Sequence, residues 1–600
     1  MNTLSFQATT TIAQNGTRTR TGHAAESLTD HAWPVTAEHL VPIAIGITGH
    51  RDLRPQDIPQ LEATLRGVLR ELRQRYPSTP ITVVSALAEG ADRLAARIAL
   101  QEGARLVAPL PMRRELYETD FPTEVSRTEF AEFLARAWSW FELPLLPGAT
   151  EDEISIYGPA RDRQYAYVGA YLARNSQMLI AMWDGVPLEL VGGTAFIAEF
   201  QLKGIPPTYI PRHSIFEPEE TGPVYHIITP RIRNQQPPEN PCKLRKLYPE
   251  RFGSQANGER AFQEMLARIE RLNRAIIQQT PPGLPQFANQ LRDPAHHEVL
   301  QTLQRCTLID QVATAEQARA SRKTVALSAA TLLMIVTMNA LALMPFSLSS
   351  IFVSYLLPLL LLLTAGGWTA YLLRGTSPYF DYRALAEGLR VRTFWLLSGI
   401  NEPVAEHYLG KQRSELDWVR QSLRAVTLPM MQGSRCYLSP SFPANSTDWS
   451  IVEKEWIAVQ ERYYTAAAKR EEVLARRARG VAVLVLLSGV LVTLLQLAWG
   501  QPLNYAPIAV IVYAEWLLPL VVGLLLMLVI RTTMQDYGRR YQRMATLFQQ
   551  GDRILRDLLS GQEYESARQM VTALGKEALN ENGEWLLRHR TRPIIVPHRE

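Results

Sequence analysis

Four long apolar stretches in the second half of the chain constrain its fold most strongly. They contain about 19 to 23 residues each and form two close pairs, Val325–Leu343 with Ile351–Leu373 and Val481–Trp499 with Ile508–Ile530. A helix of this length crosses the roughly 30 Å hydrocarbon core of a bilayer. The alternative is a buried core helix, but a globular domain rarely needs four such runs in adjacent pairs. The sequence therefore predicts an α-helical membrane domain made of two hairpins, with four transmembrane helices in all.

Lysine and arginine are sorted to one end of these stretches. Arg319, Arg322 and Arg374 flank the first pair, and Lys469 and Arg470 begin the basic segment that flanks the second. The short connections within each pair contain neither residue type. By the positive-inside rule, both hairpins have their ends in the cytoplasm. The predicted location is the cell inner membrane, with a multi-pass chain and both termini cytoplasmic.

Composition narrows the choice of partners. The chain has 63 Lys and Arg against 58 Asp and Glu, so its formal net charge is +5. Basic residues next to anionic lipid account for this surplus, and we expect no nucleic-acid partner. Cys242, Cys306 and Cys436 lack the spacing of a metal site or of a disulfide frame, so we expect reduced thiols and no metal. Residues 1–40 are polar and predict a disordered tail.

Short buried strands alternate with amphipathic helices between Val41 and about Thr229. The predicted strands are Val41–Ile47, Ile81–Val84, Arg105–Ala108, Met178–Trp183 and Thr208–Ile210. One predicted helix begins near Asp57, and three more cover Ala91–Leu100, Glu124–Trp138 and Asp162–Arg174. Such alternation indicates a parallel sheet with helices on both faces, an α/β Rossmann-like cytosolic domain. Sheets of this kind bind ligands at the carboxyl ends of their strands.

Three glycine-bearing turns fall at those carboxyl ends: Gly46–Asp52, Ser85–Asp92 and Gly192–Ala195. Glycine lets a backbone approach phosphate oxygens, and a helix N-terminus offers free N–H groups. One such turn is weak evidence, because a glycine after a strand is often plain turn chemistry. Three in one fold predict a phosphate-bearing ligand.

The motifs GITGHRDL (Gly46–Leu53), SALAEGADRLAA (Ser85–Ala96), DRQYAYVGAYLARNSQMLIAMWDG (Asp162–Gly185) and GGTA (Gly192–Ala195) resemble the SLOG superfamily. This superfamily includes Rossmann-like DNA-processing proteins, LOG enzymes and the nucleotide-sensing domain of melastatin-type TRP channels. The resemblance covers about Val41 to Ile210. It implies a pocket for a nucleotide or for an NAD- or ADP-ribose-derived signal, with no further cofactor required.

The chemistry of the side chains suggests roles in that pocket. Glycine backbones and a hydroxyl would contact phosphate, and His50 or Arg51 would supply positive charge. Arg163 would pair with phosphate, and Tyr165 or Tyr167 would stack on a base. Glu89 or Asp92 would take ribose hydroxyls. The full set of expected ligand-binding residues is Gly49, His50, Arg51, Glu89, Gly90, Asp92, Arg163, Tyr167, Asp184, Gly192, Gly193 and Thr194. In the structural alternative, Tyr165 and Tyr167 pack their helix and Asp92 caps or pairs locally.

An enzymatic alternative rests on the segment Val191–Glu199. LOG-type phosphoribohydrolases combine an arginine with a PGGxGTxxE segment, and here Arg163 and Glu199 would be the catalytic pair. The segment lacks the proline, and a second alignment places Ile197 where the acid belongs. The alternative function is a membrane-anchored hydrolase of nucleoside monophosphates.

The second half resembles the SLATT family of two-span effector modules, found with SLOG sensors in bacterial conflict systems. The resemblance is carried by Tyr382–Arg390, Phe394-Trp395 and Glu415–Arg420. It implies a ligand-gated membrane effector, an oligomeric pore or ion channel in bacterial defence, with a lipid bilayer, a nucleotide and further copies of the chain as partners. Asn339, Gln496 and Glu515 are the candidate pore residues. The expected domains are 1–40, 41–300, 301–430 and 431–600, the last two being related two-span units.

Overall fold

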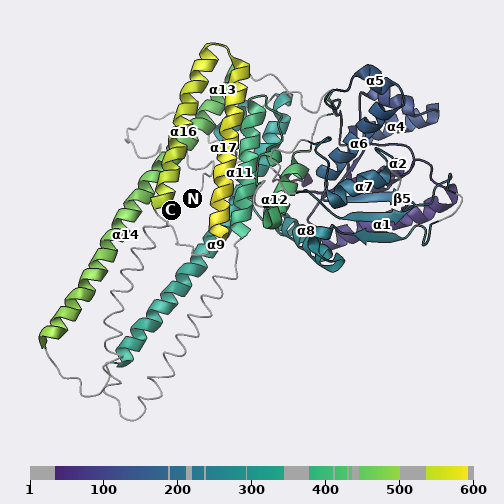
Figure 1. Cartoon of the computed structure of the whole chain (residues 1–600). Coiled ribbons are helices and arrows are strands. Elements are labelled where there is room, and N and C mark those ends of the chain that lie inside the picture. Colours follow the sequence, from purple (N-terminus) through teal and green to yellow (C-terminus); the bar gives the residue numbers. More distant parts are fainter. Residues whose placement is uncertain are drawn as a thin grey trace, which may run out of the picture. The chain divides into compact units, whose positions relative to one another are not determined.

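The computed structural model describes residues 34–186, 190–210, 219–234, 238–291, 293–342, 378–409, 413–428, 432–434, 445–499 and 535–591. The chain divides into two compact units. We call residues 5–443 with 579–600 the α/β unit, and residues 444–578, grouped with 1–4, the helical unit (Figure 1).

An eight-stranded sheet forms the centre of the α/β unit. Its strands lie in the order β7-β6-β5-β1-β2-β3-β4-β8, and all neighbours are parallel except β6 and β7. The strands are β1 (Ile43–Gly49), β2 (Ile81–Ser85), β3 (Arg105–Leu110), β4 (Ser139–Glu142), β5 (Met178–Trp183), β6 (Val224–Ile228), β7 (Leu244–Leu247) and β8 (Gln432–Ser434). From β1 to β4 the chain moves outward on one side, and β5 then returns to the other side of β1. This reversal makes the carboxyl end of β1 and β5 the topological switch point, where such sheets bind ligands.

The central strands are apolar on both faces because helices cover both. Ile43, Ala44 and Ile45 are fully buried, as parallel sheets require. The covering helices are α1 (Ile58–Arg75), α2 (Ala91–Gln101), α4 (Glu124–Arg136), α6 (Pro159–Arg174) and α7 (Thr194–Lys203), with the short α3 (Arg114–Tyr117) and α5 (Glu151–Ser155). The predicted parallel sheet with alternating helices is confirmed, and α1 packs on it through Leu61, Leu65, Val68, Leu69 and Leu72. The strand predicted at Thr208–Ile210 is wrong, because that segment is a turn and bend.

Four further helices belong to the α/β unit: α8 (Gln255–Ile277), α9 (His297–Ala342), α11 (Pro378–Leu397) and α12 (Arg413–Val426). α12 contributes to the core beneath the sheet, where Ala425 and the following Leu428 pack in one cluster with Val84 and Val107. α9 and α11 lie together through buried polar contacts, such as the ion pair between Asp310 and Arg383.

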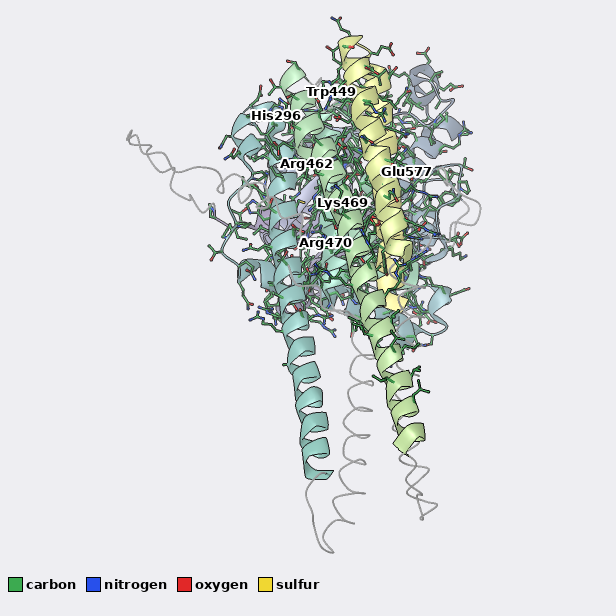
Figure 2. All side chains as sticks on the ribbon, turned by 90° about the vertical axis from the view of Figure 1, so that its left-hand side faces the viewer. His296, Trp449, Arg462, Lys469, Arg470 and Glu577 are labelled. Atoms are coloured by element: carbon green, nitrogen blue, oxygen red, sulfur yellow. The ribbon has the colours of Figure 1, made fainter. Side chains whose placement is uncertain are left out.

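The helical unit is built on α14 (Ala458–Trp499) and α16 (Gln535–Ser560), preceded by α13 (Ser446–Ile451) and a π-helical turn, Val452–Ile457. α17 (Tyr564–Thr591) begins in this unit. Aromatic contacts hold the helices together: the ring of Phe548 on α16 lies 6.0 Å from Trp456 and 5.7 Å from Tyr464. Figure 2 shows Arg462, Lys469 and Arg470 along α14, ahead of its apolar end.

The predicted membrane domain is not found. In the part of the chain that the structure describes, no helix combines the length and the apolar character needed to cross a membrane. This finding contradicts the fold class with four transmembrane helices, the multi-pass inner-membrane location and the ion-channel assignment. Two of the predicted spans, 351–373 and 508–530, lie outside the described residues.

The other two apolar stretches belong to longer elements. Residues 325–342 end α9, a continuous helix of 46 residues, and 481–499 end α14, a helix of 42 residues. Each helix begins in polar, charged sequence that packs within its own unit. The apolar stretch is therefore the last part of a longer helix and not a separate helix.

The candidate pore residues therefore have no described pore to line. Asn339 lies in α9 and Gln496 in α14, in portions whose side chains are not described, and Glu515 lies outside the described residues. Most of the predicted tail, residues 1–33, is also outside them. Its last part is ordered as a 3₁₀ turn at Ala37–His39, where the His39 ring hydrogen-bonds to Gln304 over 3.1 Å.

Candidate functional site

The turns that follow β1, β2 and β5 meet at the switch point. The backbone N–H of His50, just after β1, donates to the carbonyl of Met182 on β5 over 2.9 Å. The carbonyl of His50 accepts from the N–H of Ala91, the first residue of α2, over 3.0 Å. Three motifs that are far apart in the sequence therefore form one surface at the carboxyl edge of the sheet.

Two glycines make this close approach possible. A Cβ atom on Gly49 would lie 2.4 Å from the Cβ of Ala91. Gly90 has φ +80°, and a Cβ there would lie 2.3 Å from the carbonyl oxygen of Arg51. Glycine is required at both positions by packing of the turns themselves. A role in phosphate contact, predicted for both, would come in addition to this one.

His50 is held as a neutral ring beside Asp184. Burial and the nearby charge of Arg231 lower the pKa of His50 below its ordinary value, although Asp184 acts in the opposite direction. Its Nε2 atom accepts the backbone N–H of Asp184 over 3.1 Å, which requires a ring nitrogen without a proton. The 3.4 Å contact between His50 Nε2 and the Asp184 carboxylate is therefore not an ion pair at neutral pH. Of the two predicted sources of positive charge, the geometry favours Arg51.

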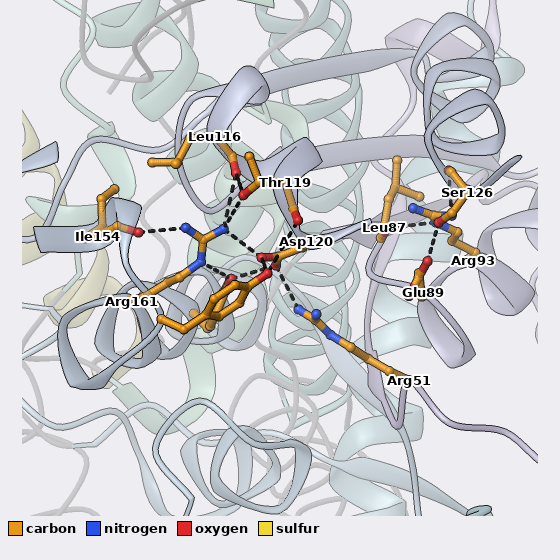
Figure 3. A network of polar contacts seen from close by, with 12 residues as sticks. Arg51, Leu87, Glu89, Arg93, Leu116, Thr119, Asp120, Ser126, Ile154 and Arg161 are labelled. Carbon is orange, nitrogen blue, oxygen red and sulfur yellow. Dashed lines mark hydrogen bonds and ion pairs between the residues drawn. The ribbon is translucent and has the colours of Figure 1, made fainter. Parts of the chain in front are cut away.

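A buried carboxylate, Asp120, organises the cationic side of the site (Figure 3). Its Oδ1 accepts from Arg161 over 2.7 Å and from Tyr157 over 3.1 Å. Its Oδ2 accepts from Tyr165 over 2.6 Å and from Arg51 over 3.2 Å. The side chains of Asp120 and Arg161 are 0% and 1% exposed, so this ion pair is fully withdrawn from solvent.

Arg51 differs from Arg161 because it reaches the surface. Its side chain is 43% exposed, and its guanidinium carbon lies 5.6 Å from the centre of the Tyr165 ring. In the described structure only its Nη2 hydrogen-bonds, to Asp120, which leaves Nε and Nη1 able to bind an anion. One carboxylate and two guanidinium groups leave one positive charge in surplus. A ligand with a phosphate group would be attracted to this point.

Asp92 and Glu89 lie on the α2 side of the site. Burial raises the pKa of Asp92 to about 7, against the effect of Arg51 and of hydrogen bonds from Ser85 and the backbone of Ala88. A carboxyl group in this state can donate a hydrogen bond as well as accept one. Glu89 accepts a hydrogen bond from the Ser126 hydroxyl.

The GGT segment packs against α6. Gly192 has φ +78°, and a Cβ there would lie 2.8 Å from the carbonyl oxygen of Asp162. Gly193 is the N-cap of α7, and Thr194 is its first residue. On α6 itself, Arg163 is exposed, whereas Tyr167 is half-buried and packs against two clusters of the core. The packing role considered for Tyr167 thus accounts for its ring.

The proposed catalytic pair receives no support from the geometry. Glu199 forms an ion pair with Lys203 one turn later on α7, with 2.7 Å between the charged atoms, and both side chains are more than half exposed. Arg163 is exposed on α6, and no described contact joins it to Glu199. The hydrolase alternative stays a prediction.

Sequence reasoning missed the residues at the centre of the cationic network, namely Asp120, Arg161 and Tyr157. A partial signal was present, because Tyr157, Arg161 and Tyr165 recur at intervals of four, the spacing of one helix face. Nothing in the local sequence marks Asp120, which ends a single 3₁₀ turn at Glu118–Asp120.

No family model, curated protein or solved structure matches this chain. The resemblance to the SLOG and SLATT families is therefore carried by the motifs alone.

Proposed function

We propose that the α/β unit binds a phosphate-bearing nucleotide, or an NAD- or ADP-ribose-derived molecule, at the carboxyl ends of β1, β2 and β5. The chain then acts as a ligand sensor. The observation that carries this proposal is the position of Arg51: a partly exposed guanidinium, fixed by Asp120 and Tyr165, stands directly after β1 at the switch point. A fixed cation loses little freedom when it binds an anion, so such a group favours phosphate over water.

The helices of the same unit are placed to respond to the ligand. α12 packs into the core cluster beneath the sheet, and Arg424 on α12 donates to the carbonyl of Arg174, the last residue of α6. α6 also carries Tyr165 and Arg161, which hold Asp120. A shift of α6 on ligand binding would therefore reach α12 through direct contacts. A ligand can favour one arrangement of these helices only if it binds that arrangement more tightly than the other.

The test is a binding measurement on the full chain. Isothermal titration calorimetry with AMP, ATP, NAD and ADP-ribose should give saturable binding of at least one of them. Arg51→Gln should weaken that binding about 10- to 100-fold, because a hydrogen bond to a charged group contributes about 1.5–3 kcal/mol.

The matched control is Arg70→Gln. Arg70 is also a partly exposed arginine paired with a carboxylate, Glu102, but it lies on α1. The Arg70→Gln protein should bind the nucleotide with the affinity of the wild type. If none of the four compounds binds, or if both substitutions weaken binding equally, the proposed site is refuted. Glu199→Gln in the same titration, with the products analysed chromatographically, tests the hydrolase alternative.

A further inference from the structure

An exposed aromatic ring lies beside the cationic site. Tyr157, in the connection between α5 and α6, is 67% exposed. Its hydroxyl nevertheless points into the protein, where it donates to the buried Asp120 over 3.1 Å. A single exposed apolar side chain is ordinary on a protein surface. Tyr157 differs from such a side chain because a buried carboxylate fixes its tip.

One face of the Tyr157 ring is covered and the other is open. The guanidinium carbon of Arg161, a buried residue, lies 4.8 Å from the centre of the ring. Because most of Tyr157 is still exposed, the face away from Arg161 meets solvent. The cation on one face and the hydrogen bond at the tip hold the ring in one orientation. A flat molecule can therefore stack on the open face at little cost in conformational entropy.

The two rings that the sequence suggested for stacking on a base offer no such face. Tyr165 is half-buried, and the guanidinium carbons of Arg51 and Arg161 lie 5.6 and 5.9 Å from the centre of its ring. Tyr167 is half-buried and packs against the core. Of these three rings, the one of Tyr157 is open to a ligand.

Arg51 and Tyr157 are connected through a single side chain. Asp120 accepts from Arg51 through Oδ2 and from Tyr157 through Oδ1, so the exposed cation and the exposed ring are two hydrogen bonds apart. In a nucleoside monophosphate, one ribose separates the phosphate from the base. A phosphate bound to Arg51 therefore leaves the base within reach of the Tyr157 ring.

We propose that Tyr157 is the base-binding residue of the nucleotide site, and that the site takes a purine nucleoside monophosphate. The phosphate binds Arg51, and the base stacks on the open face of the Tyr157 ring. This proposal rests on the function proposed above and narrows it to one class of ligand. Purines are favoured over pyrimidines because their larger ring system covers more of the tyrosine.

Isothermal titration calorimetry of the full chain with AMP and with ribose 5-phosphate tests the proposal. Ribose 5-phosphate is AMP without its base. We expect AMP to bind about 5- to 100-fold more tightly, the range for a base that stacks on an aromatic side chain. The absorbance of adenine should also fall when AMP binds, because stacking reduces it.

Substitutions of Tyr157 assign this preference to the ring. Tyr157→Leu should lower the affinity for AMP to that for ribose 5-phosphate. Tyr157→Phe keeps the ring and should keep most of the preference, although both variants lose the hydrogen bond to Asp120. Tyr564 is also an exposed tyrosine but lies in the helical unit, so Tyr564→Leu should leave both affinities unchanged. Arg51→Gln should weaken both ligands by the same factor.

The outcomes distinguish this proposal from the one on which it rests. If none of AMP, ATP, NAD and ADP-ribose binds, both are refuted. If another of these compounds binds but AMP does not at millimolar concentration, the phosphate site stands and the ligand class is overturned. If AMP and ribose 5-phosphate bind equally, or if Tyr157→Leu and Tyr157→Phe bind AMP equally, the role of the Tyr157 ring is overturned. A loss of ribose 5-phosphate binding in both Tyr157 variants overturns it as well, because Tyr157 would then only position Arg51 through Asp120.

Discussion

Replacing Asp120 by asparagine should destabilise the α/β unit strongly. The substitution keeps the shape of the side chain but removes the negative charge beside Arg161. Among the described residues, Asp120 is the only carboxylate that pairs with Arg161, and both side chains are fully buried. Removing one partner of a buried ion pair costs about 3–5 kcal/mol, because the other charge is left without compensation. The remaining acceptors of Arg161, including the carbonyl of Ile154 at 2.7 Å, carry no full charge.

Hydrogen–deuterium exchange measured by mass spectrometry reports this loss locally. The amides of α6 should exchange at least 10²-fold faster than in the wild type, since each 1.4 kcal/mol corresponds to a tenfold change in the opening equilibrium. Local exchange also avoids treating a chain of two units as a two-state folder.

A second substitution provides the control. Asp120→Asn combined with Arg161→Met removes both charges and keeps similar volumes, so the double variant should exchange more slowly than Asp120→Asn alone. Glu199→Gln, which removes one partner of an exposed pair, should leave exchange of α7 unchanged. The reasoning is refuted if Asp120→Asn exchanges within threefold of the wild type, or if the double variant is less stable than the single one.

Two further predictions concern the pH dependence of stability. The folded pKa of Asp92 is about 7, above its ordinary 3.8, so the folded state keeps a proton that the unfolded state loses between these values. Wild-type stability should therefore fall by at most about 4 kcal/mol as the pH rises from about 4 to about 7, and a Tm series should show this fall absent in Asp92→Asn. Glu220 behaves in the opposite sense: although burial alone would raise it, Arg424 and Arg420 hold its pKa below the ordinary 4.5. Its contribution should be full above pH 4.5 and decline progressively below it, so Glu220→Gln should speed amide exchange of α12 at pH 7, and by a smaller factor as the pH falls below 4.5. An unchanged pH profile in either variant would contradict the corresponding assignment.

Burial on both faces explains which strands could be predicted. β1, β2, β3 and β5 are short apolar runs, and β5 was predicted with its observed bounds, Met178–Trp183. β4 begins three residues after α4 ends, so the helical pattern of Glu124–Trp138 obscured its start. β8 consists of Gln-Gly-Ser, a sequence with no preference for a strand, and it exists only because the edge of β4 is available for pairing.

The site was predictable only in part for a similar reason. Glycine turns are local, and the sequence therefore indicated Gly49 and Gly90. The role of Asp120 depends on partners from two separate segments, one at Arg51 and one at Tyr157–Tyr165, which only the folded chain brings to it. The apolar stretches were misinterpreted for a related reason. Hydropathy reports how apolar a stretch of residues is, but it does not show where the helix that contains this stretch begins.

The return of the chain to the sheet has a practical consequence for dissecting this protein. The strand at 432–434 and the two apolar residues Ala425 and Leu428 arrive about 290 residues after the fourth strand that they adjoin. A polypeptide cut near residue 300 would leave an unprotected strand edge and a gap in the hydrophobic interior, two features that promote aggregation. The amino-terminal half is thus not an autonomous module, and expression of the α/β unit by itself must extend at least through residue 434.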